Sequence, residues 1–123
     1  MTGRRVLIVD DNRLLRLLVR TSIQSLGCEL DEATDGEEAL AAIVACQPDV
    51  VILDVVMPRL DGFEVLARLK EEKLASCRVI MLTTAAAAAD HLRASEHGAD
   101  AYLDKPFDHA ELRRIVSELL EQS

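Results

Sequence analysis

Short segments rich in Val, Ile and Leu alternate along the chain with longer segments in which apolar residues recur at helical spacing. Most of the short segments are typical of buried strands, because Val and Ile are frequent in the first, third and fourth of them and polar residues follow each one. We expect five strands, at Arg4–Val9, Cys28–Ala33, Val50–Leu53, Arg78–Leu82 and Ala101–Leu103. The second has mixed polarity and is expected at a sheet edge, whereas the third is wholly apolar and is expected to be covered on both faces.

The first helix is expected from Arg13 to Leu26, with Asn12 as its N-cap and Gly27 closing its C-terminal end. A helical wheel gives it an apolar half that we expect to be buried, made of Leu14, Leu15, Leu18, Val19, Ile23 and Leu26. The other half is polar and consists of Arg13, Arg16, Arg20 and Gln24. Leu17 falls within this polar half, so its side chain is expected to be exposed.

Four more helical segments follow the remaining strands. They run from about Glu37 to Cys46, from a D-x-x-E capping box at Asp61 to about Lys73, from the Ala85–Ala89 run to Gly98, and onward from Asp108. Strands and helices therefore alternate throughout residues 1–123, which predicts one α/β domain with a parallel sheet and helices on both faces. Right-handed connections favour the strand order 2-1-3-4-5.

Charge and hydropathy argue against several classes of protein. The net charge of −8 argues against direct binding of nucleic acid, which needs a basic patch. No apolar run approaches the ~18 residues of a membrane span and the N-terminal segment lacks the apolar core of a signal peptide, so we expect a cytoplasmic protein that does not bind membranes. The cysteines have no metal-ligand spacing and are interpreted as reduced structural thiols: Cys28, Cys46 and Cys77.

Candidate functional residues follow four of the five expected strands. Asp10 and Asp11 follow the first, Asp54 the third, Thr83 the fourth and Lys105 the fifth. The carboxyl ends of parallel strands lie at one edge of the sheet, and such sheets bind ligands in the crevice where the strand order reverses, here between the first and third strands. Solvated strand ends could account for each residue separately, but their shared position predicts a binding site.

The chemistry of these five residues favours phosphoryl transfer. Three carboxylates at one place repel one another unless a cation lies among them, and all-oxygen ligation suits Mg²⁺. Thr83 can donate a hydroxyl hydrogen bond, and Lys105 offers a compact positive charge. Together they could hold a phosphoryl group in transfer. Because carboxylates form aspartyl-phosphates, we predict that Asp54 is the nucleophile.

Five separated motifs occur in order: Asp10-Asp11, VILDVVMPRLDG with Asp54, Asp61-Gly62 within it, VIMLTT with Thr83, and YLDKPF with Lys105-Pro106. Together they resemble the CheY-like response-regulator receiver family of two-component signalling, over nearly the whole chain. The resemblance implies the flavodoxin-like fold of that family. It also implies that Asp54 accepts a phosphoryl group from a phosphohistidine on a sensor histidine kinase or a histidine phosphotransfer protein.

The resemblance further implies a ligand set for Mg²⁺. The direct ligands would be Asp11, Asp54 and the backbone carbonyl of Val56, with Asp10 acting mainly through water. The resemblance also implies a cis peptide bond between Lys105 and Pro106, which proline makes inexpensive.

Members of this family act as switches. Thr83 and Tyr102 match the family's switch pair, in which the hydroxyl moves to the phosphoryl group and the aromatic ring turns inward. That change would remodel the face made of the fourth helix, fifth strand and fifth helix, and so control binding of a downstream protein that the sequence does not identify. We expect a phosphoacceptor that catalyses only its own phosphorylation and slow dephosphorylation, and a monomer, with a phosphorylation-dependent dimer as the alternative.

Some positions depart from the family pattern or stay open. The position of Val56 often has a polar side chain in the family. Neither Val56 nor Ala85 can orient an attacking water, which predicts a long-lived phosphoryl group. The alternative is that both residues merely border the pocket. Asp104 is interpreted as a surface residue. The Ala85–Ala89 run is compatible with a mobile helix start and with an engineered replacement.

The polar half of the first helix offers a candidate docking surface for the phosphodonor. It combines the exposed Leu17 with Arg13, Arg16 and Arg20. Single exposed leucines are common on protein surfaces, so the alternative is that this leucine has no partner.

Two other classes of function are less compatible with the sequence. Aspartate-nucleophile phosphohydrolases usually place a second Asp two residues beyond the nucleophile, where this chain has Val56. A flavodoxin-type cofactor carrier needs a turn that cradles phosphate after the first strand, and Asp10-Asp11-Asn12 would repel it.

Overall fold

A computed structural model describes residues 3–57, 59–84, 92–93 and 95–122. Five parallel strands form one sheet in the order β2-β1-β3-β4-β5, which confirms the predicted topology. The strands are β1 (Arg5–Val9), β2 (Glu29–Ala33), β3 (Val50–Asp54), β4 (Arg78–Thr84) and β5 (Ala101–Lys105).

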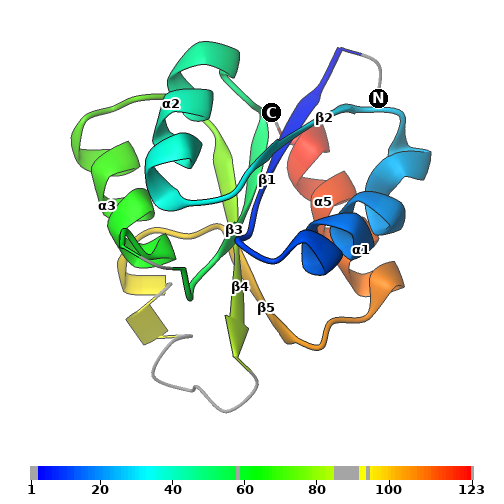
Figure 1. The fold of residues 1–123 in the computed structure, drawn as a ribbon. Helices are drawn as coiled ribbons and strands as arrows, with labels where there is room; N and C mark the ends of the chain where they lie inside the picture. The colour runs from blue at the N-terminus through cyan, green and yellow to red at the C-terminus, as the bar shows by residue number, and fades with distance from the viewer. Residues whose placement is uncertain (1–2, 58, 85–91, 94, 123) are drawn as a thin grey trace.

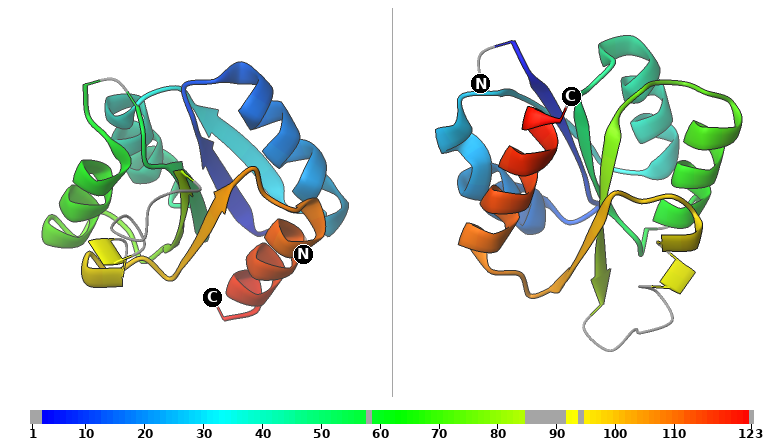
Figure 2. Two further views of the ribbon diagram at one scale, coloured as in Figure 1. Left: turned by 90° about the horizontal axis from the view of Figure 1, so that it is seen from below. Right: turned by 180° about the vertical axis from the view of Figure 1, so that it is seen from behind.

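Helices cover both faces of this sheet (Figures 1 and 2). They are α1 (Arg13–Ile23), α2 (Gly36–Cys46), α3 (Gly62–Glu71) and α5 (His109–Glu121), and a short 3₁₀ turn, η1 (Gln24–Leu26), follows α1. Figure 1 shows α1 and α5 on one side of the sheet and α2 and α3 on the other. Most of the helix expected between Ala85 and Gly98 lies outside the described residues.

The alternation of side chains along β3 builds two apolar layers, one on each face of the sheet. Val51 and Leu53 pack with α2 and α3, whereas Val50 and Ile52 pack with α1 and α5. All five residues of β3 are buried, as a central strand covered on both faces requires. The strand that carries Asp54 is therefore fixed from both sides.

The turn between β3 and α3 depends on a glycine. The Asp61 side chain accepts a hydrogen bond from the Glu64 N–H and completes the predicted capping box. Gly62 follows it, and a Cβ there would lie 2.3 Å from the carbonyl oxygen of Asp54. Only glycine permits this approach, which places the start of α3 directly behind the end of β3.

The first helix differs from the prediction. It ends at Ile23, where the chain tightens into η1, and Gly27 then adopts a left-handed conformation with φ of 74°. Leu14 and Leu18, both expected to be buried, are 62% and 36% exposed. His109, the first residue of α5, contacts Ser22 in the last turn of α1, and the buried residues of α1 all lie in its second half.

All three cysteines are free, as predicted. Cys77 is buried and the other two are partly buried. Burial raises the pKa of the Cys77 thiol to about 11, so this thiol stays protonated and unreactive at neutral pH.

Among the described residues, no helix has the length and apolar character needed to span a membrane.

Candidate functional site

Three carboxylates meet at the carboxyl edge of the sheet. Asp10 and Asp11 follow β1, and Asp54 ends the neighbouring β3, at the point where the strand order reverses. Asp10, Asp11 and Asp54 each offer an oxygen, and these oxygens all lie within 4.8 Å of one another. Asp10 and Asp54 are buried, whereas Asp11 is exposed. Burial of like charges this close calls for a compensating cation.

Lys105 supplies one positive charge to this cluster. Its Nζ lies 2.7 Å from Asp54 Oδ1 and 3.4 Å from Asp10 Oδ2. Burial nevertheless raises the pKa of Asp54, and the neighbouring Asp10 charge adds to the effect, while the hydrogen bond from Lys105 opposes it. Three carboxylates with one lysine keep an excess of negative charge, which suits a further cation.

Backbone donors fix the two buried carboxylates. The Asn12 N–H donates to Asp10 Oδ1 at 2.9 Å, and the Val56 N–H donates to Asp54 Oδ1 at 3.3 Å. The Val56 side chain itself is 60% exposed and apolar. The second carboxylate that a phosphohydrolase would place there is absent.

Thr83 is fully buried at the end of β4, yet its hydroxyl turns toward β5. It donates to Asp104 Oδ1 at 2.6 Å and lies 3.5 Å from the carbonyl oxygen of Leu103. The prediction that Asp104 is a surface residue was therefore wrong, because Asp104 is half-buried and binds Thr83. The signal that could have revealed the pair is the strand register, because Thr83 and Asp104 are direct partners across β4 and β5.

Two other predicted residues lie on or beside β5. Tyr102, the predicted switch aromatic, is 44% exposed. The peptide bond between Lys105 and Pro106 is cis.

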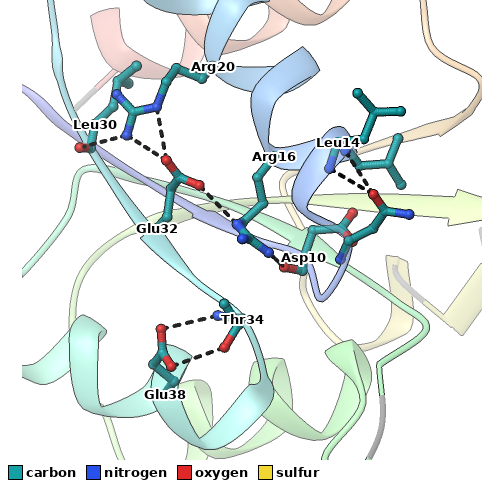
Figure 3. Close-up of polar contacts among 10 residues, drawn as sticks. Asp10, Leu14, Arg16, Arg20, Leu30, Glu32, Thr34 and Glu38 are labelled. Atoms are coloured by element: carbon teal, nitrogen blue, oxygen red, sulfur yellow. Dashed lines mark hydrogen bonds and ion pairs between the residues drawn. The ribbon is translucent and has the colours of Figure 1, made fainter.

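Arg16 differs from the other predicted docking residues. It donates through Nε to Glu32 and through Nη1 to the carbonyl oxygen of Asp10, at 2.9 and 2.8 Å (Figure 3). Its side chain is only 13% exposed. Arg20 also binds Glu32, at 2.8 Å. Arg16 therefore holds the turn after β1 against β2, and its part in the docking surface stays a prediction.

Glu32 is the acceptor common to both arginines. Burial acts to raise its pKa, but hydrogen bonds from Arg20 and Arg16 outweigh burial and lower the pKa overall. Glu32 therefore stays ionised at neutral pH, and the two guanidinium groups keep their shared partner.

The exposed first turn of α1 borders an open apolar hollow. The hollow has a volume of about 190 Å³ and is lined by Leu15, Leu18, Lys105, Pro106, Phe107 and His109. Leu17 is exposed, as predicted, and so are Arg13 and Leu14. An apolar surface therefore lies beside Lys105, next to the carboxylate cluster.

The sequence matches the family model of the response regulator receiver domain over residues 6–117. The chain belongs to the response regulator receiver family. This membership agrees with the predicted fold and family and with the position of the carboxylate cluster.

Two relatives illustrate how far the similarity extends. The DNA-binding dual master transcriptional regulator RpaA of Synechocystis sp. is 38% identical over 120 residues, covering 97% of this chain and 50% of that protein. Protein PilG of Pseudomonas aeruginosa is 36% identical over 111 residues, covering 89% of this chain and 82% of that protein. The chain spans about half the length of most curated relatives that it matches, including a Bacillus subtilis regulator, PhoP.

Solved receiver structures share the fold. The receiver domain of the Francisella response regulator 1452 superposes with a TM-score of 0.90 at 31% identity, covering 98% of both chains. Chemotaxis protein CheY4 of Vibrio cholerae superposes with a TM-score of 0.85 at 32% identity, covering 94% of this chain and 98% of that one.

Proposed function

We propose that this receiver domain accepts a phosphoryl group on Asp54 from a phosphohistidine of a sensor histidine kinase or a histidine phosphotransfer protein. The observation that supports this most directly is the buried Asp54 carboxylate, 2.7 Å from Lys105 and within a cluster of three carboxylates. An Asp54 oxygen forms a bond to phosphorus while the P–N bond to the donor imidazole breaks. The bonding electron pair stays on the imidazole nitrogen, so no co-reactant is needed.

The residues around Asp54 stabilise charge on the transferring group. Lys105 already lies within hydrogen-bond distance of Asp54, so it can donate to a phosphoryl oxygen with a small movement. The Val56 N–H and Lys105 both approach Asp54 Oδ1, which leaves Oδ2 as the oxygen that attacks phosphorus. The apolar, fully buried β3 behind Asp54 keeps the carboxylate in place during the transfer.

The oxygen ligands at this site fit Mg²⁺. Asp11, Asp54 and the backbone carbonyl of Val56 would hold the ion, with Asp10 acting through water, because Mg²⁺ prefers carboxylate, carbonyl and water oxygens. A bound ion would supply positive charge opposite the phosphoryl oxygens. Asp11 is the exposed member of the cluster, so the site remains open to an ion that keeps several waters.

The donor is proposed to dock on the first turn of α1 and the neighbouring hollow. Leu14, Leu17 and Leu18 are exposed there, and Lys105 forms part of the hollow's lining. A helix of the donor protein that covers these leucines would bring its phosphohistidine to the acceptor. Arg13 and Arg20 flank this surface, although Arg20 also binds Glu32.

The proposed output is a change in protein binding. Thr83 and Tyr102 would move together on phosphorylation and remodel the face that includes β5 and α5; the fourth helix lies largely outside the described residues. Several relatives are named as transcriptional regulators, about twice as long as this chain. We predict that this chain does not itself bind nucleic acid. We also predict that it acts as a switch and not as an enzyme on other substrates.

A small-molecule phosphodonor tests the proposal without knowledge of the kinase. The full chain with Mg²⁺ and acetyl phosphate should gain one phosphoryl group by intact-protein mass spectrometry, and Asp54→Asn should gain none. Glu71→Gln, a carboxylate-to-amide change on the exposed surface of α3, is the matched control and should react like wild type. Equal labelling of wild type and Asp54→Asn, or no labelling of either, would contradict the proposal.

The lifetime of the phosphoryl group is a separate part of the proposal. An apolar Val56 side chain cannot orient an attacking water, so decay should be slow. After acetyl phosphate is removed, Val56→Asn should lose its phosphoryl group several-fold faster than wild type. Equal decay rates would mean that Val56 only borders the pocket.

A further inference from the structure

The hydroxyl of Thr83 has a strong partner on the neighbouring strand. It donates to Asp104 Oδ1 over 2.6 Å, a distance typical of a charge-assisted bond between a hydroxyl and a carboxylate. Its other acceptor, the carbonyl oxygen of Leu103, lies at 3.5 Å and is a weak alternative. In this structure the hydroxyl is therefore committed to β5 rather than to Asp54.

A threonine hydroxyl has only one hydrogen to donate. A phosphoryl group on Asp54 presents only acceptor oxygens, and the Asp104 carboxylate likewise only accepts. Thr83 can thus donate to one of the two at a time, and its movement to the phosphoryl group requires the bond to Asp104 to break. We propose that Asp104 is a positioning residue that competes with the phosphoryl group for the Thr83 hydroxyl and thereby sets the threshold of the switch.

The surroundings of Asp104 suit this competition. Because β5 is an edge strand and Asp104 is only half-buried, solvent already reaches this residue, so losing the bond to Thr83 does not leave a buried, unpaired charge. A fully buried carboxylate would make release too costly for a usable switch. Tyr102 lies two residues earlier on the same face of β5, so the bond breaks beside the ring that is expected to turn inward.

This inference rests on the proposed function and deepens it. A ligand that needs the Thr83 hydroxyl must first overcome its bond to Asp104, and this lowers the ligand's apparent affinity. Removing the competing acceptor should therefore tighten binding of a phosphoryl analogue. The size of that gain measures the competition directly.

The test uses beryllium fluoride with Mg²⁺ as the phosphoryl analogue on the full chain. Tyr102 is the only tyrosine and there is no tryptophan, so intrinsic fluorescence reports on the switch residue itself. Asp104→Ala should bind beryllium fluoride roughly five-fold more tightly than wild type, a typical coupling between two linked sites. Asp104→Asn should gain less, because the amide oxygen still accepts a neutral hydrogen bond. An affinity unchanged in both variants would overturn the inference.

A double-mutant cycle separates this competition from simple charge repulsion. In a Thr83→Val background no hydroxyl remains to be held, so Asp104→Ala should change the affinity less than about two-fold by this reasoning. The same gain with and without the hydroxyl would show that Asp104 acts only through its charge, and would overturn the inference.

Failure of the proposed function would look different. In that case wild type would bind no beryllium fluoride, or Asp54→Asn would bind it as well as wild type, and both proposals would fall together. If wild type binds, Asp54→Asn does not and Asp104→Ala matches wild type, only the role of Asp104 is wrong.

Discussion

The two halves of the site are built differently. The acidic half consists of Asp10, Asp11 and Asp54 on β1 and β3, and backbone N–H groups hold its two buried carboxylates. The other half consists of the proposed switch residues Thr83, Tyr102 and Asp104 on β4 and β5, and a bond between two side chains joins Thr83 to Asp104 near an exposed sheet edge. A backbone N–H in a folded turn keeps its position, whereas a hydroxyl can rotate to another acceptor. Fixed geometry thus lies where bonds would form, and adjustable geometry where a signal would be passed on.

The rigidity of the acidic half can be broken at Gly62. A Cβ at Gly62 would lie 2.3 Å from the carbonyl oxygen of Asp54 and 2.9 Å from the Cα of Val55, both in the backbone. Gly62→Ala should therefore lower the free energy of unfolding by about 3 kcal/mol, measured by urea denaturation. It should also slow phosphorylation by acetyl phosphate.

Gly98→Ala is the comparison for Gly62→Ala. It adds a methyl group with no atom closer than 3.6 Å, so only its left-handed conformation, with φ of 86°, should cost stability, about 1 kcal/mol. Equal losses in both variants would show that the backbone approach at Gly62 does not matter.

The charge of the acidic half can be reduced at Asp54. Burial raises the pKa of Asp54 above its ordinary value of 3.8, so the folded protein holds this proton more tightly than the unfolded chain. Stability contributed by this group is therefore lost as the pH rises through the raised pKa. Without Mg²⁺ at pH 7, Asp54→Asn should be more stable than wild type by on the order of 1 kcal/mol.

Two further measurements check that interpretation of Asp54. The difference in stability should shrink as the pH falls through the raised pKa of Asp54, because the carboxylate of wild type then becomes protonated. Mg²⁺ should stabilise wild type and have little effect on Asp54→Asn. A variant less stable than wild type at pH 7 would show that the bond to Lys105 outweighs burial.

The backbone around Asp10 offers a smaller test. Arg16→Ala removes the donor to the Asp10 carbonyl oxygen and the ion pair with Glu32. We expect a loss of about 1 kcal/mol in the free energy of unfolding and an affinity for Mg²⁺ reduced a few-fold. Arg13→Ala, on the exposed face of the same helix, should leave both unchanged. If both variants bind Mg²⁺ alike, Arg16 does not organise the site.

The smallest effect on the fold is expected at Leu17. Leu17→Glu should change stability by no more than about 0.5 kcal/mol, because the side chain is 55% exposed. Phosphotransfer from the cognate histidine donor should slow several-fold, while the reaction with acetyl phosphate should stay the same. Val44→Glu, equally exposed on the opposite face of the sheet, is the matched control. Unchanged transfer from the protein donor would mean that Leu17 is not in the docking surface.

The sequence predicted the sheet and the acidic half well, because both follow from local patterns. Apolar runs mark the strands, and the polar residue after each run marks the carboxyl edge. The bond between Thr83 and Asp104 was missed because it depends on the register of two strands, which periodicity does not encode. The contact of Arg16 with the Asp10 carbonyl was missed because a polar residue on the polar half of a helix is predicted to face solvent. Leu14 and Leu18 were misplaced because a helical wheel shows which face is apolar but not which turns of the helix are buried.

The charged character of β2 bears on how copies of the protein can associate. An unpaired edge strand invites a strand from another molecule, and acidic side chains discourage this. Three of the five residues of β2 are Glu29, Asp31 and Glu32, and Arg5, Arg16 and Arg20 already pair with the two glutamates. A second copy of the strand would have to fit against these engaged side chains and would bring the two Asp31 carboxylates close together. The sheet is therefore protected from lengthening by self-pairing at β2.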